Sequence, residues 1–238
     1  MCALAALAQS VNAQTVRLHG AVTLEKLLLE QKQALESQTG VKLEIVGNGA
    51  GRGLVDLGGG RADVAMIGGT LKGVAGAMNK EKAGSVDVTG MREIPLTRVK
   101  IALVTHAAVG VKSLTEAQAR DVLTGKATNW KEVGGIDVPI KVVLPFAGDG
   151  SRITMQEVLL KDAEYAKTAI VRNSAKDVAV VLKQLAGSCS ILSVKNVEPG
   201  LAIVTLDKDV ELPMQLVVKG EPTGDVKKVV DAAKAGIK

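Results

Sequence analysis

The chain has three glycine-rich loops that each follow a predicted strand and precede a predicted helix. They lie around Gly20, Gly49 and Gly148. Apolar runs predict the strands, and apolar residues at helical spacing predict the helices. Repeated strand–loop–helix order is typical of an open α/β sheet, in which ligands bind outside the carboxyl ends of the strands. We therefore expect an α/β protein in which these loops form one site.

The segment 128–152 shows this order most clearly. A predicted helix at Asn129-Trp130 ends at the tight turn Gly134-Gly135, and a buried strand then runs into Gly148-Asp149-Gly150-Ser151-Arg152. A glycine loop between a strand and a helix presents main-chain N–H groups at the helix N-terminus, which favours anion binding. The sequence therefore predicts a site for a small anion.

Alternation of strands and helices occurs twice along the 238 residues. The first half gives a βαβαβ pattern, with strands at 16–18, 41–46 and 62–69. After an apolar strand at 99–104 the pattern starts afresh at Ser113, which we expect to cap a helix together with Glu116. A chain of this length can form two lobes of about 100 residues each.

The composition restricts the class of partner. Aromatic side chains are limited to Trp130, Phe146 and Tyr165, so base stacking on aromatic platforms is not expected. The net charge is +5, and lysines and arginines alternate with acidic residues without a run of like charge. Such a pattern indicates a solvated surface. The alternative is that the positive charge contributes to capture of an anion. Two histidines far apart, His19 and His106, indicate no metal site.

The first thirteen residues resemble the remnant of a secretory signal peptide. A short apolar run precedes Val11-Asn12-Ala13, which has the small-x-small pattern of a cleavage site. The alternative is a disordered alanine-rich tail. Secretion to the periplasm is the expectation. Cys2 would be removed, and Cys189, in an apolar neighbourhood, is predicted to be a buried and inert thiol.

The sequence lacks the motifs of nucleotide-binding proteins and enzymes at the spacing that they require. Gly125-Lys126 is followed by Ala127 rather than Ser or Thr, and Arg52 stands where a dinucleotide loop starting at Gly47 needs glycine. The sequence has no nucleophile elbow and no paired nucleophile and base. We therefore expect neither an enzyme nor a cofactor, and we interpret Asp63 as a turn or cap residue.

Two groups of residues resemble the phosphate-binding proteins of ABC transporters. One runs from Leu114-Thr115 through Asn129-Trp130-Lys131-Glu132-Val133-Gly134-Gly135, and the other covers 47–53 and 60–65. The resemblance extends over 16–219. It implies a type II periplasmic-binding-protein fold, with two open mixed sheets joined by two crossing strands. The crossings would lie near 100–106 and 191–195, with lobe I at 14–104 and 192–238 and lobe II at 105–191.

The same resemblance implies the ligand contacts. They are Thr23, Asn48, Gly49, Ala50 through its N–H, Gly150, Ser151 and Arg152, with Asp149 as an uncertain addition. The family pattern is broken where its hydroxyls fall on Ala21 and Ala50, its aspartate on Gly68 and its arginine on Pro145. A hydrogen bond to a charged group contributes roughly 1.5–3 kcal/mol, so these losses predict a large drop in phosphate affinity.

Asp149 allows three interpretations. It could accept a hydrogen bond from a protonated oxyanion in place of the missing aspartate, it could cap the following helix, or it could be a solvated loop residue. The predicted function is that of a monomeric solute-binding protein, which captures an oxyanion, phosphate first, by hinge closure for an ABC permease. The alternative is a sensing or scaffold protein that keeps the fold but has a degenerate phosphate site.

Overall fold

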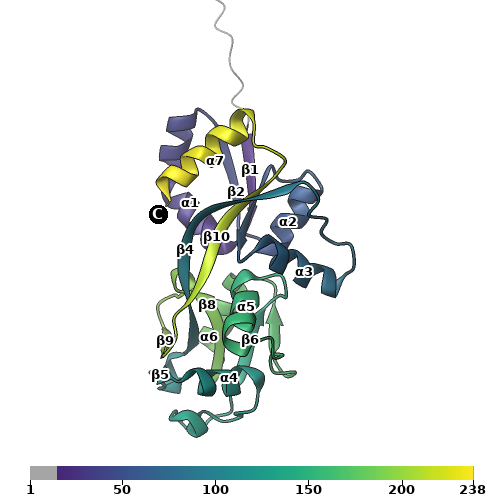
Figure 1. Ribbon diagram of the computed structural model, residues 1–238. Helices are drawn as coiled ribbons and strands as arrows, with labels where there is room; N and C mark the ends of the chain where they lie inside the picture. Colours follow the sequence, from purple (N-terminus) through teal and green to yellow (C-terminus); the bar gives the residue numbers. More distant parts are fainter. Residues whose placement is uncertain (1–14, 238) are drawn as a thin grey trace, which may run out of the picture.

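The computed structural model describes residues 15–237 and forms two lobes joined by two long strands (Figure 1). The signal segment predicted at 1–13 lies outside the described residues. Strand order follows one continuous path, β2-β1-β3-β10-β4-β8-β6-β7, while β9 pairs with β4 off this path and β5 pairs with β9. The predicted α/β class is confirmed, although the two expected sheets share their crossing strands and form one path.

The first lobe, at the top of Figure 1, is built from the first βαβαβ unit and the last helix. Its elements are β1 (Thr15–Gly20), α1 (Val22–Thr39), β2 (Lys42–Val46), α2 (Ala50–Gly58), β3 (Val64–Gly68), α3 (Leu71–Glu81) and α7 (Gly224–Gly236). β1 pairs in parallel with both β2 and β3. Leu24, Leu28 and Leu35 bury one face of α1, and Gly40 ends it in the left-handed conformation that glycine adopts without strain.

The second lobe, at the bottom of Figure 1, contains the remaining short elements. They are η1 (Ala107–Val109), β5 (Ser113–Leu114), α4 (Glu116–Thr124), η2 (Trp130–Val133), β6 (Lys141–Pro145), α5 (Gly150–Met155), η3 (Gln156–Leu160), β7 (Ile170–Arg172), α6 (Ala175–Gln184), β8 (Ser188–Ser193), η4 (Val194–Asn196) and β9 (Leu201–Leu206). Trp130 is fully buried, and its indole N–H donates to the carbonyl of Gly187 at 2.8 Å. The family-like segment therefore serves as a core anchor.

β4 (Met91–His106) and β10 (Val210–Lys219) are the strands that connect the lobes. They pair antiparallel over ten positions, with a register shift between Met214 and Gln215. Met214 is opposite Thr97 while Gln215 is opposite Pro95, so Leu96 is the extra residue of a bulge. The expected crossing at 191–195 is wrong, because β8 pairs with the carboxyl half of β4 and β10 makes the second crossing.

The lobe boundaries stay a prediction. β9 pairs with β4 at 103–106 and with β5, which favours assigning 201–206 to the second lobe. The predicted cap of the helix after residue 113 is also corrected. Ser113 lies in β5, and Thr115 with Gln118 forms the capping box of α4.

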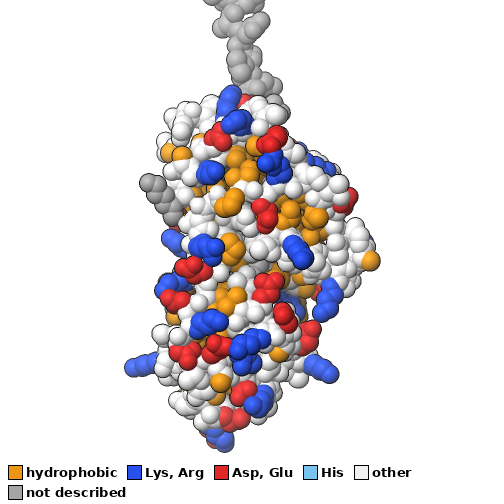
Figure 2. Space-filling model, viewed as in Figure 1, with side chains coloured by type: hydrophobic (Ala, Val, Ile, Leu, Met, Phe, Trp, Pro, Cys, Tyr) orange, Lys and Arg blue, Asp and Glu red, His pale blue; other side chains and the backbone are white. Residues whose placement is uncertain are grey.

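The surface and core agree with the composition. In Figure 2 acidic and basic side chains alternate over the visible face, without an area of one sign. Cys189 is fully buried, and burial raises the pKa of its thiol to about 12. Of the helices between residues 15 and 237, none combines the length and the apolar character needed to cross a bilayer.

Candidate oxyanion site

The glycine loops of the two lobes meet between the lobes. Within the first lobe, the N–H of Gly49 donates to the carbonyl of Gly20 at 2.7 Å. Across the gap, the N–H of Gly51 donates to the carbonyl of Gly148 at 3.0 Å. A Cβ on Gly150 would lie 1.9 Å from the carbonyl oxygen of Gly68. Only glycine permits such close approach of main chains. The sequence thus brings the ends of β1 and β3 and the start of α2 against the loop after β6.

Two apolar side chains fill the space between these loops. A Cβ on Gly49 would lie 2.5 Å from the ring of Phe146. A Cβ on Gly51 would lie 2.4 Å from the sulfur of Met78, and a Cβ on Gly148 would lie 2.5 Å from the same sulfur. Sequence analysis missed both residues. The signal for Phe146 was an aromatic residue directly after a strand, in a loop otherwise made of small and charged residues.

On the first lobe, the predicted side chains are already engaged within the protein. Thr23 is buried in the first turn of α1, and its hydroxyl accepts from the amide of Asn196 at 3.0 Å. The Asn48 amide donates to Asp56 Oδ2 at 2.8 Å. Ala50 is the buried first residue of α2 and contributes only its main chain.

Asp149 caps α5. Its Oδ1 accepts from the N–H of Ser151 at 2.9 Å and from that of Arg152 at 3.3 Å. The capping interpretation is therefore confirmed, and Asp149 is half-buried rather than freely solvated. Burial raises the pKa of its carboxyl group, against the opposing effect of the two N–H donors and the Arg152 charge. Two of the donors expected to face a ligand are thus engaged by a carboxylate of the protein.

Arg152 is held against the second lobe. Nη1 donates to the carbonyl of Pro145 at 2.9 Å, and the guanidinium lies 5.6 Å from the centroid of the Tyr165 ring. The Tyr165 hydroxyl donates to the carbonyl of Arg152 at 2.7 Å, and burial raises the pKa of that hydroxyl. These contacts fix the arginine beside the loop while leaving other guanidinium N–H groups for a ligand.

The family model described as a PBP superfamily domain matches residues 6–236. This chain belongs to the PBP superfamily. The "Phosphate-binding protein PstS" of Bacillus subtilis (strain 168) is 23% identical over 236 residues, which cover 93% of this chain and 75% of that protein.

Two solved structures share the fold of this chain. One is a putative phosphate ABC transporter substrate-binding protein with bound phosphate from Clostridium perfringens, which is 25% identical with a TM-score of 0.77 over 91% of each chain. The other is an ABC-type phosphate transport receptor from Vibrio cholerae, 20% identical with a TM-score of 0.65 over 92% of this chain and 93% of that one. The predicted family resemblance and type II fold are confirmed.

This PBP-superfamily chain has a polar cluster behind the loop of Asn48 that sequence analysis also missed. Asp56 accepts from His19 Nδ1 at 2.9 Å, from Asn48 at 2.8 Å and from Arg61 Nε at 2.8 Å. Burial alone would raise the pKa of Asp56, but these three partners together hold it below its usual value. Asp56 therefore orients Asn48 and fixes the loop, which is the positioning that an anion site needs.

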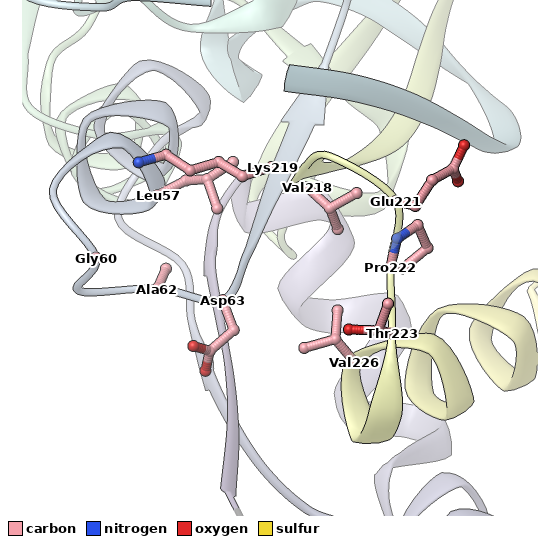
Figure 3. Close-up of a pocket in the computed structure, with 10 residues that line it drawn as sticks. All are labelled: Leu57, Gly60, Ala62, Asp63, Val218, Lys219, Glu221, Pro222, Thr223 and Val226. Carbon is pink, nitrogen blue, oxygen red and sulfur yellow. The ribbon is translucent and has the colours of Figure 1, made fainter. Parts of the chain in front are cut away.

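The pocket in Figure 3 lies elsewhere, where the α2–β3 and β10–α7 connections meet. It measures about 270 Å³. Its lining residues are Leu57, Gly60, Ala62, Asp63, Val218, Lys219, Glu221, Pro222, Thr223 and Val226. Asp63 pairs with Arg17 at 2.8 Å and accepts the Arg17 N–H, which agrees with its interpretation as a structural residue at a strand start. None of the predicted ligand contacts lines this pocket, so it is separate from the loop region.

Proposed function

We propose that this chain is an extracytoplasmic solute-binding protein that captures a small oxyanion, phosphate first, and delivers it to an ABC permease. The observation that carries the proposal is the meeting of glycine loops from both lobes at one place. Binding there needs no covalent chemistry. The relatives named for phosphate support the choice of ligand, and the sequence of residues 1–13 supports a periplasmic location. The protein would act as a monomer.

Closure would turn the lobes about the β4–β10 ribbon. The bulge at Leu96 interrupts the regular pairing midway along this ribbon, so bending there breaks few ladder hydrogen bonds. Because the loops touch in the described arrangement, an oxyanion enters when the lobes part. Closure is favoured when the ligand makes contacts with both lobes that the open state lacks.

The proposed contacts are those of the sequence analysis. The first lobe offers the main chain at Ala50 together with Thr23 and Asn48. The N–H of Gly49 donates to the carbonyl of Gly20 and would have to be released to reach a ligand. The second lobe offers Gly150, Ser151 and Arg152, while the cap formed by Asp149 competes for two of its N–H groups. Arg152 is the contributor of positive charge on this side of the site.

Calorimetric titration with inorganic phosphate tests the proposal. We expect binding by the purified chain and a loss of about tenfold or more in affinity for Arg152→Met, since a charge-assisted contact is removed. Arg120→Met is the matched control, because Arg120 also donates to a main-chain carbonyl of the second lobe, that of Leu159 at 3.1 Å. No phosphate binding by the wild-type chain, or equal losses for both variants, would contradict the proposed site.

A second candidate, a sensing or scaffold protein with a degenerate site, is favoured by the internal capping at Asp149 and by the filling of the gap by Phe146 and Met78. Phosphate uptake by cells that lack the gene separates the two. Unchanged uptake together with absent binding in vitro supports the second candidate, and reduced uptake supports transport.

A further inference from the structure

Arg52 reaches from the first lobe to the second. Nη1 donates to the main-chain carbonyl of Asn173 at 2.7 Å, and Nη2 donates to Asn173 Oδ1 at 3.3 Å. The guanidinium also lies over the ring of Phe146, 4.6 Å from its centroid. Both partners belong to the second lobe, so a single side chain makes a forked hydrogen bond and a cation–π contact across the gap.

The neighbours of Arg52 explain why it stands in this position. It lies in the first turn of α2 between Gly51 and Gly53. A Cβ on Gly53 would lie 2.4 Å from the carbonyl oxygen of His19, and one on Gly51 would lie 3.2 Å from the Cα of Gly148. Gly53 lets the turn pack against the end of β1 in its own lobe, and Gly51 lets it approach the second lobe. Nη1 also donates to the carbonyl of Asn48 at 3.2 Å, which fixes the arginine to its own turn.

Other contacts between the lobes differ from this one in burial. Glu25 of α1 pairs with Lys176 of α6 at 2.7 Å, and Lys80 of α3 pairs with Glu164 at 3.3 Å. The side chains of Lys80 and Glu164 are 80% and 75% exposed, so solvent screens that pair. Arg52 is half-buried and stacked on a ring that is 9% exposed. The arginine contact therefore combines exposed hydrogen bonds to Asn173 with stacking on a buried ring, which the Lys80–Glu164 pair lacks.

We propose that Arg52, Asn173 and Phe146 form an interlobe clasp that holds the lobes closed without a ligand. Arg52 is then a positioning residue that sets the fraction of open molecules. An oxyanion that enters only the open form binds at a rate proportional to that fraction, so the clasp slows both association and release. This consequence for binding rests on the proposed function, whereas the clasp itself does not.

Small-angle X-ray scattering of the full chain without phosphate tests the clasp. We expect the wild-type profile to match the closed structure and Arg52→Ala to give a larger radius of gyration. Arg52→Lys, which keeps the charge but lacks the planar fork, should lie between them. Phe146→Leu removes the ring from the other lobe and should open the molecule as well. Lys80→Ala, which breaks an exposed interlobe pair, is the matched control and should leave the profile unchanged.

Two outcomes would overturn the clasp. One is an Arg52→Ala profile that superimposes on that of the wild type while circular dichroism shows both to be folded. The other is a wild-type profile that fits only separated lobes.

Stopped-flow mixing with phosphate tests the consequence of the clasp for binding. If the open fraction rises tenfold in Arg52→Ala, the association rate of phosphate with this variant should rise by on the order of tenfold. Opening without any phosphate binding would refute the proposed function and leave the clasp standing.

Discussion

The first lobe presents mostly small residues to the gap, apart from Arg52, whereas the second lobe presents charged side chains. On the first lobe, Gly20, Gly49 and Ala50 bring the main chain to the surface of the gap. On the second, Asp149 and Arg152 stand at the start of α5. The acidic group of the first lobe, Asp56, lies behind its loop and orients Asn48 and His19.

This difference separates two requirements of an anion site. Close approach of main-chain N–H groups needs residues without side chains, and the first lobe meets that need. In the proposed site, Asp149 and Arg152 of the second lobe are the charges placed to repel or attract an anion. Changes to the glycines of the first lobe should therefore act on folding, and changes to the charges at the start of α5 should act mainly on binding.

Substitution of Gly20 should give the largest effect. Gly20 has φ +142°, and a Cβ there would lie 2.0 Å from the carbonyl oxygen of Met66. We expect Gly20→Ala to lower the free energy of unfolding by about 2–4 kcal/mol, because the β1 and β3 ends must separate. Urea denaturation measures this. Gly76→Ala is the control, because nothing lies within 4 Å of its added Cβ on an exposed part of α3. Equal stability of the two variants would contradict the packing argument.

Near neutral pH, Asp149→Asn should act mainly on binding. Asparagine is also a good N-cap residue, so the helix start is retained while the negative charge is removed. We expect phosphate to bind about 10- to 100-fold more tightly, because repulsion is lost and the N–H groups of Ser151 and Arg152 are more easily released. Calorimetry with phosphate measures the change.

Asp207→Asn is the matched control for that prediction. Asp207 also accepts a main-chain N–H at a helix start, that of Glu116 at 2.8 Å. The helix in this case is α4 rather than α5. Its substitution should leave affinity unchanged. Weaker binding by Asp149→Asn would instead identify Asp149 as the acceptor of a proton from the oxyanion, the role that the sequence left open.

The order of strands, loops and helices around the site could be predicted from the sequence, but their partners could not. Residues 191–194 and 212–218 are both apolar strands that pair with β4. Nothing local distinguishes which of them pairs with its amino half and so crosses between the lobes. Ser113 with Glu116 and Thr115 with Gln118 have the same capping-box spacing, and only the pairing of β5 with β9 decides between them. Selection among such equivalent local patterns is a tertiary effect.

The candidate site shows the same limit. Glycines at 20, 49 and 148 predicted loops able to approach one another, since glycine has no side chain to separate them. That Phe146 and Met78 fill the space depends on contacts between residues far apart in the chain. The capping role of Asp149 was among the local possibilities, because Asp followed by a helical run is a typical N-cap.

Two carboxylates on opposite faces should give opposite dependences of stability on pH. The pKa of Asp56 is lower in the folded protein than in the unfolded chain. Its contribution to the free energy of unfolding is therefore present above the pKa of the unfolded chain and is lost as pH falls through the pKa of the folded protein. The pKa of Asp149 is raised, so the folded state loses stability as pH rises from the unfolded value through the folded one. Urea unfolding between about pH 3 and pH 7 should therefore give stability differences for Asp56→Asn and Asp149→Asn that change in opposite directions. Differences that change in parallel would refute the assignment.

The smallest effects should come from the two lysine pairs that join the lobes. Lys176 contacts Glu25, whose side chain is 12% exposed and also accepts the N–H of Gly47 at 2.9 Å. Lys176→Ala leaves that carboxylate without its cation beside the loop, and we expect a loss of about 0.5–1.5 kcal/mol in the free energy of unfolding. Lys80→Ala leaves Glu164 in solvent, so a change within about 0.5 kcal/mol is expected.

Because both pairs bridge the lobes, an equal loss for both would mean that bridging itself stabilises the fold. Unequal losses in the stated order would mean that burial of the acidic partner decides the effect. Thermal or urea unfolding of the two variants, at low and high salt, distinguishes these cases, since screening weakens an exposed pair more than a shielded one.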